Sequence, residues 1–238
     1  MANAWPPGEE QRRGGWRFRW TSGVTRRANS VLAIGDGADM EDLVAFGEAF
    51  YAQRKACPLF LVSNGSAPPG LAAHLASRGY HPEARTLVMT AWTAEVAQRA
   101  RAGGWHVTVA ETADDDWFNA YWSVEGLRDR STEDGLVCRT VLLASALPQR
   151  FASAHLDGTV VATGQAVLEQ GWAGLQCMAT RPAHRGQGAA SAVLVALADG
   201  VDTERMYLAV QADNRPAIAL YERCGFSFVH DYEYWARR

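Results

Sequence analysis

The sequence has no excess of positive charge and no long apolar run. Its 238 residues include 23 Lys and Arg against 26 Asp and Glu, a formal net charge of −3. A protein that binds nucleic acid through its phosphates usually carries a basic surface, so this balance argues against such a partner. No apolar stretch approaches the roughly 20 residues of a membrane helix. Residues 1–8 also lack the pattern of a signal peptide. We expect no nucleic-acid or membrane partner.

Cysteines are few and scattered. None of the four forms a Cys-x-x-Cys pair, which argues against a zinc site and against a disulfide framework. We therefore expect no metal and a reduced, cytoplasmic protein. The four positions are Cys57, Cys138, Cys177 and Cys224.

The composition that remains is that of a globular chain, with 48% hydrophobic and 21% charged residues. The length allows one large domain or two small ones. The most informative stretch is 174–191. There an apolar run to Thr180 is followed by a turn with Pro182, Gly186 and Gly188, and then by a run rich in alanine and leucine. This order predicts strand, glycine loop and helix, with free backbone N–H groups that suit an anion.

Two motifs in this chain resemble those of one family. The loop Arg185-Gly-Gln-Gly-Ala-Ala190 lacks the Gly-Lys-Ser/Thr ending of a P-loop and the Gly-x-Gly-x-x-Gly of a dinucleotide site. It resembles the acyl-CoA pyrophosphate loop, Arg/Gln-x-x-Gly-x-Gly/Ala, of the GNAT superfamily of N-acetyltransferases. Downstream, Asn214, Tyr221 and the pair Gly225-Phe226 resemble the superfamily's asparagine, tyrosine and Gly-Phe ending. The resemblance implies the GNAT fold, an α/β fold with a mixed sheet.

The resemblance also implies acetyl-CoA as the cofactor and a set of residues that bind it. In the family, two parallel strands separate at a bulge, and the freed backbone groups bind the pantetheine arm. The residues placed at the cofactor are Met178, Ala179, Thr180, Arg185, Gly186, Gln187, Gly188, Ala189, Ala190, Asn214 and Tyr221. Tyr221 would also protonate the leaving thiolate, since a phenol of pKa ~10 is a reasonable donor to a thiolate of pKa ~8.5. A helix N-cap for Asn214 and a core position for Tyr221 are the structural alternatives.

A general base is needed to neutralise the amine. Glu169, beside the central strand, and His155, on the preceding hairpin, are the candidates, although both suit ordinary turn and sheet positions. Cys177 is interpreted as a small buried strand residue rather than a nucleophile. Seven aromatic residues would line an acceptor cleft or fill the core, and we favour the core for most of them. They are Trp117, Tyr121, Trp122, Trp172, Tyr232, Tyr234 and Trp235.

The first part of the chain repeats the order of the last part. Residues 59–90 read as strand, helix, Gly79-Tyr80 and strand, and alignment on the Gly-aromatic pairs sets Pro68 against Asn214 and Leu75 against Tyr221. Residues 26–35, opposite the glycine loop, contain no Gly-x-Gly. We interpret 1–100 as a truncated, degenerate GNAT-like domain and 104–238 as the catalytic domain. Residues 1–14 are expected to be frayed, and 228–235 to close the second sheet.

The predicted function is transfer of an acetyl group from acetyl-CoA to a primary amine of a small molecule or peptide. The family implies direct attack in a ternary complex. The alternatives are a non-catalytic CoA-binding regulatory module and a scaffold whose first half binds a protein. We expect a monomer or homodimer. The sequence does not identify the acceptor.

Overall fold

The computed structural model describes residues 3–35, 39–101, 103–126 and 131–237. Within them the strands form one mixed sheet of eleven, in the order β1-β2-β3-β4-β11-β5-β10-β9-β8-β7-β6. The strands are β1 Glu9–Arg13, β2 Trp16–Trp20, β3 Val31–Leu32, β4 Leu59–Ser63, β5 His81–Trp92, β6 His106–Ala110, β7 Gln149–Leu156, β8 Thr159–Glu169, β9 Trp172–Thr180, β10 Arg205–Gln211 and β11 Ser227–Ala236. The helices are α1 Met40–Ala52, α2 Leu71–Ser77, α3 Thr93–Arg99, α4 Asp115–Glu125, α5 Thr132–Leu143, the 3₁₀ helix η1 Pro182–His184, α6 Ala189–Asp199 and α7 Arg215–Arg223. The α/β fold with a mixed sheet is as predicted.

Residues 3–14 are ordered, contrary to our expectation of a frayed segment, and residues 1 and 2 lie outside the described part of the chain. β1 pairs with β2 as an antiparallel hairpin from Glu9↔Trp20 to Arg13↔Trp16. Ahead of it, Trp5 is only 4% exposed and donates a hydrogen bond from Nε1 to Thr25 Oγ1 at 3.0 Å. The burial of this one large aromatic ring supplies the stabilisation that the Pro- and Gly-rich composition does not suggest.

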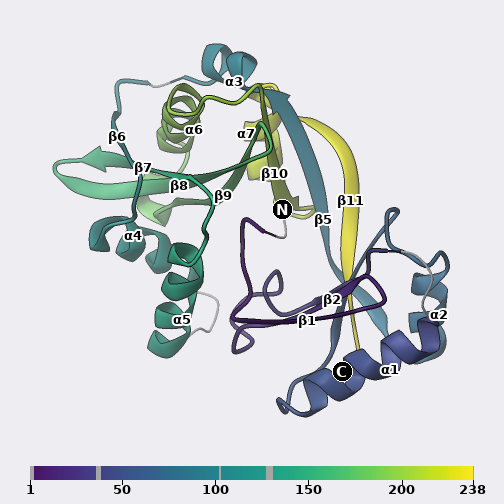
Figure 1. Cartoon of the computed structure of the whole chain (residues 1–238). Coiled ribbons are helices and arrows are strands. Elements are labelled where there is room, and N and C mark those ends of the chain that lie inside the picture. Colours follow the sequence, from purple (N-terminus) through teal and green to yellow (C-terminus); the bar gives the residue numbers. More distant parts are fainter. Residues whose placement is uncertain (1–2, 36–38, 102, 127–130, 238) are drawn as a thin grey trace.

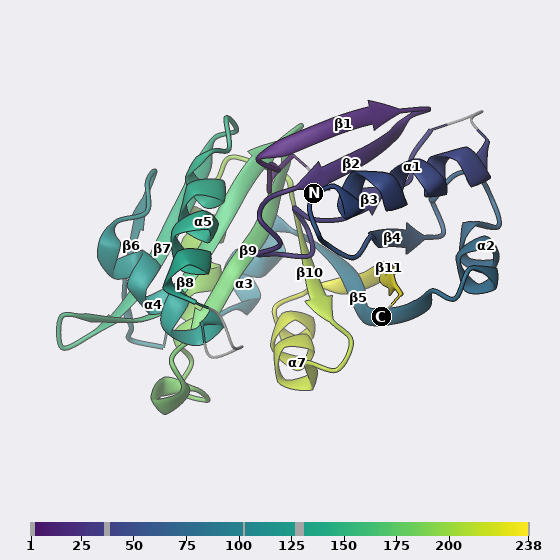
Figure 2. The same ribbon diagram turned by 90° about the horizontal axis from the view of Figure 1, so that it is seen from below.

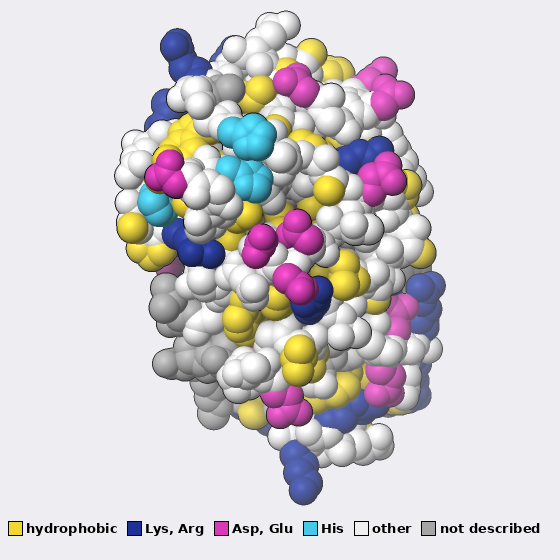
Figure 3. All heavy atoms as spheres, turned by 90° about the vertical axis from the view of Figure 1, so that its left-hand side faces the viewer, with side chains coloured by type: hydrophobic (Ala, Val, Ile, Leu, Met, Phe, Trp, Pro, Cys, Tyr) yellow, Lys and Arg dark blue, Asp and Glu magenta, His cyan; other side chains and the backbone are white. Residues whose placement is uncertain are grey.

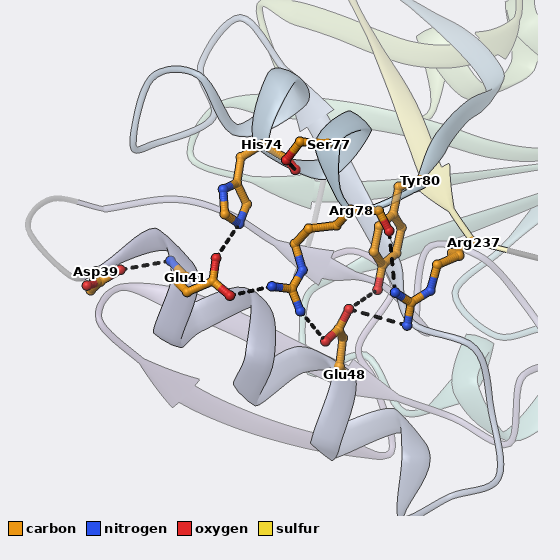
Figure 4. A network of polar contacts seen from close by, with 8 residues as sticks. All are labelled: Asp39, Glu41, Glu48, His74, Ser77, Arg78, Tyr80 and Arg237. Carbon is orange, nitrogen blue, oxygen red and sulfur yellow. Dashed lines mark hydrogen bonds and ion pairs between the residues drawn. The ribbon is translucent and has the colours of Figure 1, made fainter.

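The core of the first half lies between its strands and α1. Asp39 caps α1 by accepting a hydrogen bond from the backbone N–H of Glu41, and Leu43 and Phe50 lie on the buried face, as the apolar stripe predicts. Trp16, Phe18 and Phe60 complete the same hydrophobic cluster. On the outside, Arg78 at the end of α2 joins that helix to α1 by pairing with Glu41 and Glu48 (Figure 4).

In the second half, helices cover both faces of the strands β6 to β9 (Figure 1). On one face α6 packs with α3, and α7 belongs to the same hydrophobic cluster. On the other face α4 and α5 form a cluster that contains Trp117 and Cys138. The turn between β7 and β8 has positive φ at both Asp157 and Gly158, as a two-residue hairpin turn requires and as an Asp-Gly pair between two strands favours.

The two halves exchange strands. β5, from the first part of the chain, lies between β10 and β11 and pairs antiparallel with both. β11, the last strand, lies between β5 and β4 of the first half. The expectation that 228–235 closes the second sheet was therefore wrong in its pairing, since β5 takes the place next to β10. The sheet crosses the boundary that we predicted near residues 100–104, and these two strands link the halves in Figure 1.

Two strand–helix–strand units repeat the same local geometry. β4–α2–β5 and β10–α7–β11 both end their helix with a glycine of positive φ, Gly79 and Gly225. Beyond each glycine the aromatic residue's N–H bonds a helix carbonyl, Tyr80 to Leu75 and Phe226 to Tyr221, each at 3.0 Å. This likeness supports the alignment made from the sequence. The interpretation of the first half as a truncated copy stays a prediction.

The surface on the side of the outer strands of the second half is mixed in character. Figure 3 shows acidic, histidine and apolar side chains interspersed there with a few Lys or Arg, and the described side chains form no continuous basic patch on this face. Among the described residues, no helix is both long and apolar enough to span a membrane.

Candidate active site

The central feature of the site is a gap between two parallel strands. β9 and β10 pair from Trp172↔Arg205 to Leu175↔Leu208, and no pairing between them continues beyond Leu175. The register of β9 against β8 shifts in the same region, where Gln165 pairs with Gln176 and Thr163 with Ala179. Cys177 has φ +55°, an uncommon value for a residue with a side chain, and marks the bulge. The bulge turns the end of β9 away from β10.

The glycine loop follows this diverging strand. η1 leads from Arg181 to Arg185, and Gly188, with φ +89°, is the N-cap of α6. Gly186 has φ +75°, and a Cβ atom there would meet nothing within 4 Å, so the backbone is open on that side. No described residue accepts a hydrogen bond from the backbone N–H groups of residues 186–191. These donors therefore point to an external acceptor at the positive end of α6.

Side chains hold the loop without covering it. Trp105 Nε1 donates to the carbonyl of Gln187 at 2.9 Å, and Arg185 Nε donates to the carbonyl of Thr180 at 3.2 Å. The Arg185 side chain is exposed, so its remaining donors face solvent. The first turn of α6 contains no acidic residue. The loop thus presents donors and positive charge without a neighbouring carboxylate to compete.

Helix α7 places Asn214 and Tyr221 beside the gap. Asn214 is the N-cap, accepting a hydrogen bond from Ala217 N at 3.3 Å. Tyr221 is 7% exposed, and burial raises its pKa to about 12. Asn214, Tyr221 and Met178 line one hollow of about 290 Å³ along the diverging strands (Figure 2 shows α7 against β10). The structure thus brings these three predicted site residues together.

The two candidate bases do not lie in this hollow. Glu169, at the end of β8, accepts a hydrogen bond from Asn3 Nδ2 at 2.6 Å and pairs with Trp172 across a turn. Its charge adds to the burial that raises the pKa of Tyr207. His155 lies in β7, beside the edge strand β6, and its Nε2 is 3.0 Å from Thr108 Oγ1 of that strand. Both residues thus take the structural positions that we named as alternatives.

Cys177 and most of the aromatic residues also take structural positions. Burial raises the pKa of the Cys177 thiol well above its usual value, so it remains a thiol at neutral pH and is a poor nucleophile. Trp117 and Trp122 belong to the core under α4, and Trp235 packs against the first-half cluster. Tyr121, Tyr232 and Tyr234 are also buried in hydrophobic clusters, and each lines the hollow as well.

Several residues at the site were not singled out from the sequence. A second hollow of about 170 Å³ adjoins the first and is lined by Trp5, Arg27, Gln176 and His230 among others. Arg27 and Trp5 come from segments without helical or strand periodicity. His230 follows a bulge in β11, which alters the alternation of its neighbours. Only the arrangement of the halves places them together.

Three features define a protein of the GNAT superfamily of N-acetyltransferases: separated parallel strands, a glycine loop whose amides have no acceptor among the described residues, and a buried tyrosine on α7. The chain belongs to the family described as "Probable histone acetyltransferase Rv0428c C-terminal", whose model matches residues 1–235. A Bacillus subtilis (strain 168) protein described as "Uncharacterized N-acetyltransferase YobR" is 27% identical over 241 residues, which cover 100% of this chain and 96% of that protein.

Solved structures share the fold. A GCN5-related N-acetyltransferase from Kribbella flavida matches with a TM-score of 0.68 and 16% identity, covering 97% of this chain and 90% of that one. A tandem GNAT protein from the clavulanic acid biosynthesis pathway matches with a TM-score of 0.64 and 17% identity, covering 82% and 68%. At these identities the likeness concerns the fold alone. Together with the family, it supports an enzyme of GNAT type.

Proposed function

We propose that this protein transfers the acetyl group of acetyl-CoA to a primary amine of a small molecule or peptide, by direct attack in a ternary complex. The observation that carries the proposal is the set of backbone N–H groups of residues 186–191, which have no acceptor among the described residues. They follow β9 a few residues after Met178, which lines the hollow that contains Tyr221. Acetyl-CoA supplies the activated thioester.

The loop fits the diphosphate of such a cofactor. Its amides have no partner among the described residues, and Gly186 offers open space where another residue would carry a Cβ atom. Hydrogen bonds to a charged group contribute about 1.5–3 kcal/mol each. Several of them, with Arg185, support an affinity in the micromolar range, about −8 kcal/mol. Unpaired backbone groups near Met178 would hold the cofactor's arm.

Tyr221 acts as the proton donor in this proposal. With a pKa of about 12 the phenol stays protonated at neutral pH, so it offers a hydrogen bond wherever negative charge develops on the leaving sulfur atom. Its burial excludes water, which strengthens that interaction. Asn214 fixes the start of α7 and thereby the position of Tyr221 two helical turns later.

For the general base we propose His230 rather than Glu169 or His155, the candidates from the sequence. His230 lines the hollow that adjoins the Tyr221 hollow, and we propose that it accepts the proton of an amine in the Tyr221 hollow through water molecules between the two hollows. Glu169 and His155 remain candidates only if they act over a longer water chain. If this assignment holds, His230→Asn should lower kcat/KM in the thiol-release assay without changing the affinity for acetyl-CoA.

The test has two stages. A thermal-shift titration with acetyl-CoA measures binding, and release of free thiol with an amine panel measures transfer. Stabilisation by acetyl-CoA followed by thiol release with at least one amine is the expected result. Stabilisation without thiol release for any amine would favour a CoA-binding regulatory module, and no stabilisation would remove the proposal.

A further inference from the structure

The hollow that contains Tyr221 and the smaller hollow beside it meet at Arg27. The smaller hollow is largely apolar, with Leu32, Leu61 and Tyr207 in its wall. Arg27 lines both, together with Gln176 and the rings of Tyr232 and Tyr234. A molecule in the smaller hollow would therefore pass Arg27 before reaching the gap between β9 and β10.

Among the residues that the structure describes, none forms an ion pair with Arg27. Its one described hydrogen bond runs from Nη1 to Gln176 Oε1 at 3.5 Å, and no described carboxylate forms an ion pair with it. The next residue along the chain, Arg26, pairs with Glu83 at 3.1 Å, and the buried Arg19 donates to the carbonyl and hydroxyl of Ser30. A guanidinium offers five donors, so most of those of Arg27 are unused. The groups around it include the phenols of Tyr121, Tyr232 and Tyr234 and the Cys177 thiol, whose pKa is raised by burial. The carboxylate of Glu125 also lines the larger hollow, but no ion pair joins it to Arg27.

The backbone holds Arg27 in place. It lies in the loop between β2 and β3, which is built around the buried Asn29. Asn29 Oδ1 accepts hydrogen bonds from the N–H of Thr21 and Gly23, and its Nδ2 donates to the carbonyl of Thr25. Gln176 is fixed as well, since its Nε2 donates to the carbonyl of Ala4 at 3.0 Å. A half-buried cation on a fixed loop is preorganised for an anion.

We propose that Arg27 binds the carboxylate of the acceptor, and that the acceptor is an α-amino acid with an apolar side chain. This inference rests on the proposed function. A guanidinium binds a carboxylate through two parallel hydrogen bonds. With the carboxylate at Arg27, the apolar side chain occupies the smaller hollow among Leu32, Leu61 and Tyr207, and the amine points into the hollow that contains Tyr221. The carboxylate, the side chain and the amine of the α-carbon would thus each contact a part of the site that suits its chemistry.

The experiment compares amines that differ only in the carboxylate. Phenylalanine is paired with 2-phenylethylamine, and leucine with 3-methylbutylamine, in the thiol-release assay on the full chain. We expect kcat/KM to be at least about 100-fold higher for each amino acid. In Arg27→Gln this preference falls at least about 30-fold while the values for the plain amines stay within about threefold. Arg27→Lys, which keeps the charge but not the paired hydrogen bonds, retains part of the preference. Arg12→Gln, at an exposed side chain on β1, is the matched control with unchanged values.

Calorimetry with phenylalanine in the presence of CoA measures the same contact without turnover. Binding that is lost in Arg27→Gln and kept in Arg12→Gln supports the inference even if no thiol is released, in which case the proposed function alone fails. Equal losses for amino acids and plain amines in Arg27→Gln would overturn it. So would a preference of the parent protein for amines without a carboxylate, including a lysine side chain in a peptide.

Discussion

The strand–loop–helix unit β3–α1 of the first half and the unit β9–α6 of the second half differ at the start of the helix. α1, after β3, begins with Asp39, whose carboxylate accepts a hydrogen bond from the N–H of Glu41, and Glu41 and Asp42 follow in its first turn. α6, after β9, begins with Gly188 and has no side-chain cap and no acid in its first turn. Carboxylates satisfy one helix N-terminus from within, whereas the other is available to an anion from outside. The same architecture is thus structural in the first half and suited to binding in the second.

The two halves also differ at one position of the helix in the strand–helix–strand units β4–α2–β5 and β10–α7–β11. Tyr221 of α7 lines a hollow, while its counterpart Leu75 of α2 is completely buried in the first-half core. The hydrogen bonds that end the two helices match, so the backbone is the same and the side chain at one position differs. The shared helix ending thus serves folding in both strand–helix–strand units, whereas only the unit with Tyr221 places a hydroxyl group at a hollow.

The largest expected effect concerns whether the halves are separable at all. Residues 104–238 expressed alone lack β5, which lies between β10 and β11. Both strands would then expose unpaired N–H and C=O groups, and a loss on this scale exceeds the roughly 5–15 kcal/mol that stabilises a domain. We expect no cooperative unfolding by circular dichroism. A chain cleaved between residues 101 and 104, with both pieces present, should keep its melting transition. An isolated fragment that melts within a few degrees of the full chain would contradict this.

The next prediction converts α6 into a helix like α1. Ala190→Asp places a carboxylate in the first turn, where α1 carries Glu41. Repulsion of the diphosphate should raise the Kd for acetyl-CoA about 100-fold, equivalent to about 2.7 kcal/mol. Isothermal calorimetry measures the effect, and Ala190→Asn, of nearly the same shape without the charge, should change Kd by less than about fivefold. Equal affinities for the two variants would mean that the anion binds elsewhere.

A third prediction removes the hydroxyl that distinguishes α7 from α2. Tyr221→Phe should lower kcat about 100-fold, since general acid catalysis contributes at least that much, with KM for acetyl-CoA nearly unchanged. Tyr80→Phe is the matched control in the first half, where the hydroxyl bonds Glu48 at 3.0 Å and lies outside the proposed site. Steady-state kinetics measure kcat and KM for both variants, and only Tyr221→Phe should lower kcat. If kcat of Tyr221→Phe equals that of the parent, Tyr221 is not the proton donor.

The fourth prediction concerns alkaline stability. Burial raises the pKa of Tyr221 and Tyr207 to about 12 each, with Glu169 adding to the shift of Tyr207. Because these phenols ionise near pH 10 in the unfolded chain, their neutral forms stabilise the fold below pH 10, and this contribution is lost as the pH rises from 10 to 12. Urea unfolding at pH 8, 10 and 11 should show a steep decline, and Tyr221→Phe should reduce the decline by about 2 kcal/mol at most. An identical decline in parent and variant would mean that the Tyr221 hydroxyl is solvated.

The features that could be predicted from the sequence are local ones. The glycine loop, the Asn214 and Gly225 boundaries of α7, the Asp39 cap and the Asp157-Gly158 hairpin depend on residues within a few positions of each other, and the structure has all of them. The meeting of Met178, Asn214 and Tyr221 followed from the family's motifs. Local backbone chemistry suffices for such features.

Strand exchange could not be predicted in the same way. β5 and β11 carry similar alternating patterns, and pairing between residues 81–92 and 227–236 depends on contacts over more than a hundred residues. Arg27 was missed because its loop has no periodicity, and its place is set by the side chain of Asn29. The candidate bases were chosen because they lie close to the central strand in the sequence. Proximity in the sequence does not show which residues of the other half line the hollow.

The smallest expected effect concerns the network that joins α1 and α2. Arg78 pairs with Glu48 at 2.6 Å and with Glu41, and Arg237 approaches Glu48 at 3.5 Å (Figure 4). These side chains are partly solvated, so Arg78→Ala should reduce the free energy of unfolding by about 1 kcal/mol, and less at 1 M salt. Because the network lies around α1 and α2 and includes no residue of the glycine loop, kcat/KM should stay unchanged, while the salt dependence of urea unfolding falls. A change in acetyl-CoA affinity in this variant would show instead that α1 and α2 influence the loop through the shared strands β5 and β11.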